Sequence, residues 1–179
     1  SDCLSSVTKA LEIDPDDPEA HRILGAIKLM REDFDQAEYH HERARELCPS
    51  DAYIIQRYAT LLIYLGKPEK ALEEIINAKR IDPFCPDILF EDEGICYYWL
   101  DRLPEAAETF NKLQIPTRNS LYYLAATYNQ ICDNDRASTV LKEANSMSNL
   151  SVEEFVQSQK YKDANQSQKL LDTLTMIAT

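Results

Sequence analysis

The sequence is poor in glycine and in basic residues. Only three Gly occur among 179 residues, too few for the Gly-rich loops that cradle nucleotide phosphates. Lys and Arg number 19 against 31 Asp and Glu, which gives a net charge of −12. We therefore expect neither nucleic-acid backbone binding nor attachment to an anionic membrane surface. No apolar run approaches the roughly 20 residues that a bilayer-spanning helix needs.

Patterns that carry catalysis or bind metals are also missing. No Ser or Cys sits in a nucleophile elbow, and the acidic excess is spread along the chain rather than paired. The five Cys form no CxxC motif, so we interpret them as reduced, structural thiols of a cytoplasmic protein. They are Cys3, Cys48, Cys85, Cys96 and Cys132. The sequence thus predicts no enzymatic activity, no cofactor and no metal; a zinc site is the weaker alternative.

Three histidines fall in one stretch of the chain. We expect His21 and His41 to lie on facing sides of two helices and His40 to face solvent. Two close imidazoles can bind a metal, but no Cys or carboxylate is placed to complete a set of four ligands. Packed side chains are the preferred interpretation.

A period of 34 residues runs through the first half of the chain. Asp14-Pro15, Cys48-Pro49 and Asp82-Pro83 recur at this interval. Other residues return in phase with these prolines: Gly25 with Ala59, Ala37 with Ala71, Ala44 with Ala78, and Asp17 with Asp51. Such a period fits one helix–turn–helix unit stacked on the next, because a proline stops the second helix of each unit.

The period predicts an all-α fold, a right-handed superhelical solenoid of antiparallel helix pairs with a C-terminal capping helix, in a single domain over 1–179. The expected units are the second helix of a truncated repeat at 1–17, repeats at 18–51 and 52–85, a shortened repeat at 86–117, a repeat at 118–150 and the cap at 151–179. Because the chain opens inside a repeat, we expect it to be a piece of a longer protein. Ser151 to Glu154 form a capping box, and a last helix is expected from about Ala164 to Ile177.

At these small-residue, aromatic and proline positions the chain resembles the tetratricopeptide repeat. The resemblance implies that the first helix of each repeat lines a concave groove for a partner. The groove residues carried over are Arg22, Tyr53, Gln56, Arg57, Thr60, Tyr64, Glu91, Asp92, Ile95, Tyr98, Trp99, Tyr122 and Asn129. The Lys and Asn clamp that holds acidic chaperone tails in this family is absent, because Arg22, Ala26, Gln56 and Thr60 occupy its positions. A chaperone-tail adaptor is therefore not expected.

Residues 52–179 also resemble the C-terminal repeat region of bacterial adenylate/guanylate cyclase-like proteins and of winged-helix regulators. The matching segments are Arg80 to Phe84 leading to Gly94, Leu103 to Ala107, the connection at Pro116, Leu124 to Tyr128, Phe155, and Lys160 to Asp163 before a leucine-rich helix. This resemblance implies a regulatory or oligomerising module of a larger protein.

We expect a non-enzymatic scaffold that binds a protein or peptide in its concave groove. The aromatic groove residues and the acidic Glu91 and Asp92 suit a partner with apolar side chains and Lys or Arg. One alternative is a self-association module that forms a homodimer through its ends, including the leucine stripe of the last helix. A small-molecule sensor ranks last.

Overall fold

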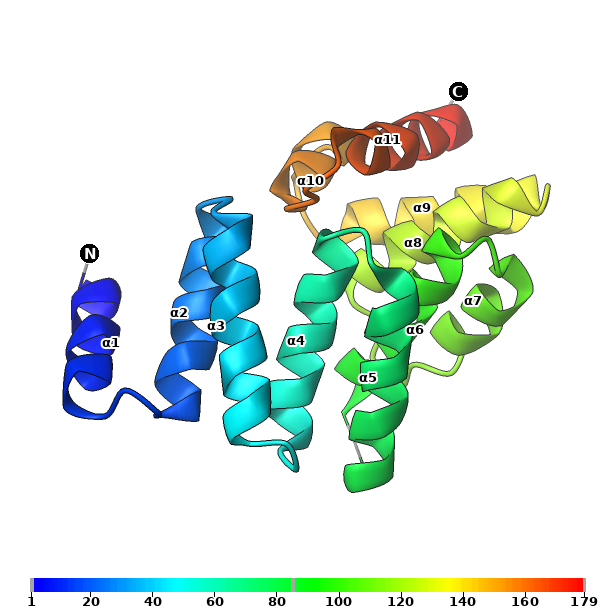
Figure 1. Ribbon diagram of the computed structural model, residues 1–179. Coiled ribbons are helices and arrows are strands. Elements are labelled where there is room, and N and C mark those ends of the chain that lie inside the picture. The colour runs from blue at the N-terminus through cyan, green and yellow to red at the C-terminus, as the bar shows by residue number, and fades with distance from the viewer. Residues whose placement is uncertain (1, 85, 179) are drawn as a thin grey trace. The chain divides into compact units, whose positions relative to one another are not determined.

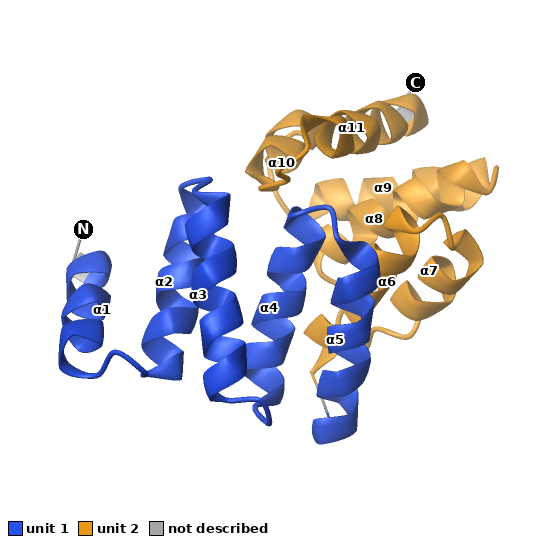
Figure 2. Cartoon of the chain, viewed as in Figure 1, with its two compact units in different colours: residues 1–85 blue, residues 86–179 orange. Residues whose placement is uncertain are grey.

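The computed structural model describes residues 2–84 and 86–178, and everything it describes is helix, turn or loop. Eleven helices follow one another along this part of the chain (Figure 1). They divide into two compact units, Ser1–Cys85 and Pro86–Thr179 (Figure 2). The division falls where the sequence predicts the boundary between the second and third repeats.

Unit 1 contains one single helix and two helix pairs. Its helices are α1 (Asp2–Ile13), α2 (Pro18–Met30), α3 (Phe34–Leu47), α4 (Ala52–Tyr64) and α5 (Pro68–Ile81). The two hairpins α2–α3 and α4–α5 hold the most extensive contacts, α3 packs on α4, and α1 packs on α2. The alanines that share the 34-residue period are fully buried between these helices.

Unit 2 contains two helix pairs and a two-helix cap. Its helices are α6 (Asp87–Trp99), α7 (Leu103–Phe110), α8 (Arg118–Gln130), α9 (Asn134–Ser146), α10 (Val152–Ser158) and α11 (Ala164–Ala178). The cap helix α11 packs on α8, α9 and α10. Its Leu170 and Leu174 are fully buried, so this part of the predicted leucine stripe is core.

Short local signals set the helix ends. Asp17 and Asp51 cap α2 and α4, each accepting hydrogen bonds from two backbone N–H groups of the first turn. The predicted capping box at Ser151 and Glu154 is present at the start of α10. These caps explain why the helices begin at the positions that the period predicts.

Each turn inside a helix pair passes through the left-handed backbone region. The residues there are Glu32, Gly66, Asp101 and Cys132, with φ between 58° and 71°. Only the second repeat uses glycine, the residue that adopts this conformation without steric cost. The other three turns hold an unfavourable local conformation that their helix pairs impose.

The close contact between the two helices of a pair follows a size rule. A Cβ atom added to Gly25 would lie 2.7 Å from the His41 ring, and one added to Gly94 would lie 2.6 Å from the Phe110 ring. In the other two pairs, Ala59 and Ala125 stand at the glycine position, and the aliphatic Ile75 and Leu141 replace the ring. Glycine thus stands opposite an aromatic ring, and alanine opposite a branched aliphatic chain.

We predict that Gly25→Ala destabilises the protein by about 1–2 kcal/mol. Overpacking against the His41 ring costs about 1–3 kcal/mol, and the better helix propensity of alanine recovers up to about 1 kcal/mol. The double variant Gly25→Ala with His41→Ile copies the Ala59 and Ile75 pair and should recover the loss. Urea unfolding of both single variants and the double variant measures the coupling; additive effects would contradict the size rule.

A second prediction concerns the pH dependence of stability. Burial, followed by the charges of Arg57 and Arg22, lowers the pKa of His41 to about 3. An unfolded histidine has a pKa of about 6.5, so between these values the unfolded chain binds a proton that the folded chain does not. Stability should therefore fall as the pH drops through this window, by up to about 1.4 kcal/mol per pH unit.

The measurement is urea unfolding at several pH values between 7.5 and 4, on the wild type and on His41→Ile. The variant retains every carboxylate, so it should lose less stability than the wild type over this range. An identical decline in the two proteins would show that His41 is not the group responsible.

Candidate functional site

Six of the predicted groove residues lie in unit 1, on α2 and α4, and seven lie in unit 2. In unit 1, Tyr53 is the most exposed member of the set, and Arg22 packs beside it. The Arg22 guanidinium lies 5.0 Å from the centre of the Tyr53 ring, and Tyr53 is 56% exposed. Arg22 also donates a hydrogen bond of 2.7 Å to Glu19, and this contact raises its pKa. An arginine held over an exposed tyrosine is a preformed polar and aromatic surface.

Arg57 lies on the same helix as Tyr53 and is half-buried. Its Nε atom is buried and has no hydrogen-bond partner, and no ion pair joins the guanidinium to an acid within residues 2–84 or 86–178. A half-buried guanidinium without an acid paired to it favours a carboxylate from a partner, because an arginine–carboxylate pair is a strong, charge-assisted interaction. Arg57 is therefore the strongest candidate in unit 1 for contact with a carboxylate.

Gln56, Thr60 and Tyr64 complete the predicted set in unit 1. Gln56 is buried and donates a 2.8 Å hydrogen bond to Thr60 Oγ1, while Thr60 donates to the Gln56 carbonyl. Tyr64 is half-buried and packs on the core cluster of Leu29, Ala37 and Leu61. These three residues are less exposed than Tyr53 and do not enlarge the surface that it forms with Arg22.

A shallow depression of about 400 Å³ lies along α2 beside Arg22. Its lining is mainly apolar and consists of Arg22, Ile23, Ala26, Ile27, Met30 and Arg31. Met30 is largely exposed, which sequence reasoning missed. Its exposure follows from its place at the last position of α2, which the period alone does not distinguish from a core position.

In unit 2 the predicted acidic patch is not a surface. Glu91 and Asp92 are buried. The Glu91 carboxylate accepts hydrogen bonds from Thr117 Oγ1 and from Asn119 Nδ2, the latter at 2.7 Å. It thereby ties α6 to the start of α8. The expectation that these two acids attract a basic partner is corrected accordingly, because buried carboxylates are not accessible to a partner.

The aromatic residues of unit 2 form a buried cluster with the cap. Tyr98 and Tyr122 are almost inaccessible to solvent. Burial raises the pKa of Tyr98 to about 12, and its hydroxyl accepts a 2.9 Å hydrogen bond from Gln130. Tyr122 stacks on Phe155 of α10, with ring centres 4.2 Å apart. Two further members of the predicted set follow this pattern: Ile95 is buried and Asn129 is half-buried.

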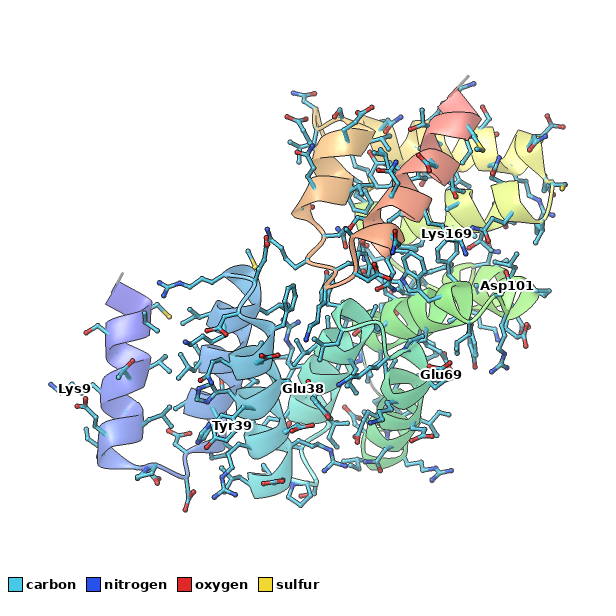
Figure 3. All side chains as sticks on the ribbon, turned by 45° about the horizontal axis from the view of Figure 1, so that its top comes forward. Lys9, Glu38, Tyr39, Glu69, Asp101 and Lys169 are labelled. Atoms are coloured by element: carbon cyan, nitrogen blue, oxygen red, sulfur yellow. The ribbon has the colours of Figure 1, made fainter. Side chains whose placement is uncertain are left out.

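Trp99 is half-buried and contacts the loop between α10 and α11. Its indole N–H donates to the Tyr161 hydroxyl at 3.2 Å, and the Lys169 ammonium lies 6.0 Å from its ring centre. Figure 3 labels Lys169 on α11. Tyr161 also contacts the hydroxyl of buried Tyr123. The cap therefore covers part of the surface that the sequence assigns to a partner.

The histidines pair differently from the expectation. His21 Nδ1 lies 2.9 Å from His40 Nδ1, and His40 is buried rather than solvent-facing. His21 Nε2 donates to the Pro15 carbonyl at 3.0 Å, so His21 Nδ1 accepts the hydrogen bond from His40. His41 instead packs on Gly25. No cluster of three or more metal-ligating side chains occurs in the described chain, and none of its helices has the length and apolarity to cross a bilayer.

No protein-family model and no curated protein sequence matches the chain. Solved structures do match it. PilW, a type IV pilus biogenesis factor, has a TM-score of 0.75 at 19% identity, covering 97% of this chain and 80% of its own. PilF of Pseudomonas aeruginosa has a TM-score of 0.70 at 18% identity, covering 96% of this chain and 78% of its own.

A third similar structure is YrrB, described as a tetratricopeptide repeat protein with an unusual peptide-binding site. Its TM-score is 0.60 at 21% identity, with coverage of 80% of this chain and 75% of YrrB. At these identities the likeness concerns the fold. The chain thus has the fold of the tetratricopeptide repeat proteins, an all-α solenoid of antiparallel helix pairs.

Proposed function

We propose that the protein is a non-enzymatic scaffold that binds a protein or peptide through the α2–α4 face, defined by Arg22, Met30, Tyr53 and Arg57. The observation that carries this proposal is the half-buried Arg57 guanidinium, which lacks a partner in the described chain, on the helix that also presents Tyr53. Tyrosine, arginine and methionine are enriched in binding surfaces because they combine large apolar area with polar contacts.

The partner chemistry follows from the charges of this face. Arg57 favours a carboxylate, and the apolar depression beside Arg22 favours an aliphatic or aromatic side chain. The expected partner is therefore acidic, whereas a partner that complemented Glu91 and Asp92 would be basic; those two residues are buried. We infer a segment in which Asp or Glu alternates with apolar residues.

We further propose that the scaffold serves as a regulatory part of a larger signalling protein in the cytoplasm. The sequence resemblance of residues 52–179 to cyclase-like and winged-helix regulators supports this role. Cys3, Cys48 and Cys132 are free thiols, which accords with a reducing compartment. The net charge of −12 supports a partner other than nucleic acid.

The self-association alternative receives less support from the last helix. Leu170 and Leu174 are fully buried against the rest of unit 2. A dimer formed through these leucines would require α11 to leave its own unit, and its apolar contacts there would be lost.

We predict that Tyr53→Ala and Arg57→Gln each weaken peptide binding at least about tenfold. Truncation of a central aromatic or arginine anchor costs about 2 kcal/mol or more, and 1.4 kcal/mol corresponds to tenfold in affinity. The probes are twelve-residue peptides selected from a displayed random library against the wild-type chain. Their dissociation constants are measured by fluorescence polarisation, after circular dichroism confirms that each variant is folded.

The matched controls are Tyr39→Ala and Arg80→Gln. Tyr39 (labelled in Figure 3) is 56% exposed, as Tyr53 is, but lies on α3, and Arg80 is exposed on α5. Both controls should bind like the wild type. Selected peptides that bind all four variants equally, or a selection that enriches no peptide, would refute the α2–α4 face as the binding site.

A further inference from the structure

The second helix of the third repeat is unusually short. Helix α7 has 8 residues, whereas α3 and α5 have 14. The chain leaves the helix at Asn111, and the backbone N–H groups of Gln114 and Ile115 donate to the Asp87 carboxylate at 3.0 and 2.9 Å. These bonds hold the loop after α7 in one place. The space that the last turns of a full-length helix would fill is therefore left to other side chains.

A pocket of about 190 Å³ lies beside the end of α7. It is lined by Phe110, Asn111, Leu113, Pro116, Ser120, Leu121, Leu124, Val140 and Glu143. Leu113 stands in the loop where the other repeats have a helical alanine, and it forms part of the pocket lining. An apolar cavity of about 150 Å³ holds a molecule of benzene, so this pocket has room for one branched aliphatic or phenyl group.

Two of the polar residues in the pocket lining are already satisfied. The Asn111 side-chain amide donates to the Ala107 carbonyl at 2.6 Å and to the Tyr128 hydroxyl at 2.9 Å. The Ser120 hydroxyl donates to the Thr117 carbonyl at 2.9 Å. Neither side chain needs a ligand to complete its hydrogen bonds.

Glu143 differs from these two residues. It is exposed, and its carboxylate makes no hydrogen bond or ion pair with any residue of the described chain. An apolar pocket with an unpaired carboxylate in its lining favours a ligand that carries an apolar group next to a cation.

We propose that this pocket docks a leucine-sized side chain of a partner protein, whose neighbouring Lys or Arg pairs with Glu143. An exposed residue supports a peptide rather than a small molecule: Ile115, next to Pro116 in the chain, is 77% exposed and offers further apolar contact to a chain segment. The site shares no residue with the α2–α4 face, so either proposal can fail while the other stands.

The test uses capped tetrapeptides and the full chain with ¹³C-labelled Leu and Val methyl groups. The acetyl-Gly-Leu-Lys-Gly amide should shift the methyl signals of Leu113, Leu124 and Val140 in a saturable way. The Gly-Leu-Glu-Gly analogue should bind about two- to fivefold more weakly, the range expected for a solvent-exposed ion pair. The Gly-Gly-Lys-Gly analogue lacks the apolar group and should give no saturable shift.

Two variants separate the apolar and the ionic contributions. Val140→Phe fills the pocket and should abolish binding of the leucine peptides, whereas Glu143→Gln should bind the Lys and Glu peptides equally. Asp135→Asn removes another exposed carboxylate of α9 and should leave the preference intact. Because Glu143 and Asp135 are both exposed, neither change should affect folding.

Three outcomes would overturn the proposal. The first is the absence of saturable shifts at these three residues. The second is a preference for the Lys peptide that persists in Glu143→Gln. The third is tighter binding of 3-methylbutylammonium than of the Leu-Lys peptide, which would assign the pocket to a small cationic molecule instead of a protein segment.

Discussion

The close approach of the two helices in each pair is the constraint on which both units depend. At the point of closest approach, a Gly or Ala on the first helix packs against a larger side chain on the second helix. The two side chains together must fill the same volume in every pair. Gly25 faces the His41 ring and Gly94 faces the Phe110 ring at distances that exclude a Cβ atom. Because interiors are close-packed, a change on one side must be matched on the other. This close packing fixes the orientation of the two helices in each pair, and with it the orientation of their outer faces.

The outer face of the first helix of a repeat has different roles in the two units. Arg22 in the first repeat and Glu91 in the third occupy the same place in their helices, and each reaches the first helix of the following repeat. Arg22 contacts exposed Tyr53 and leaves a surface, whereas Glu91 is buried by its bonds to Thr117 and Asn119. The same helix position thus contributes to the proposed α2–α4 face in the first repeat and to the interior of unit 2 in the third.

Helix positions could be predicted from the sequence because their signals are local: Asp17, Asp51 and Ser151 as caps, Gly66 at a turn, and prolines at helix ends. The fate of Trp99 could not, since it depends on Tyr161, 62 residues away along the chain. The burial of His40 could not be predicted either, for a related reason. Helical periodicity suggests a solvent-facing side chain, but His40 is hydrogen-bonded to His21, which in turn bonds the Pro15 carbonyl. The positive φ values at Glu32, Asp101 and Cys132 cannot be predicted from the residue types, because Glu and Cys rarely adopt this conformation and Asp is also common in ordinary turns.

Departures from the period carry more functional information than agreement with it. In a repeat fold each unit interacts mainly with its neighbours, so a local defect lowers stability locally and leaves the other repeats intact. The shortened α7 is such a defect, because it leaves a pocket beside its end. Arg57 is a different case: its buried Nε has no hydrogen-bond partner in the described chain. In the two proposals, a bound partner fills the pocket beside α7 and pairs with the Arg57 guanidinium. For this reason the two proposals place binding at these positions rather than at the buried aromatic cluster around Tyr98.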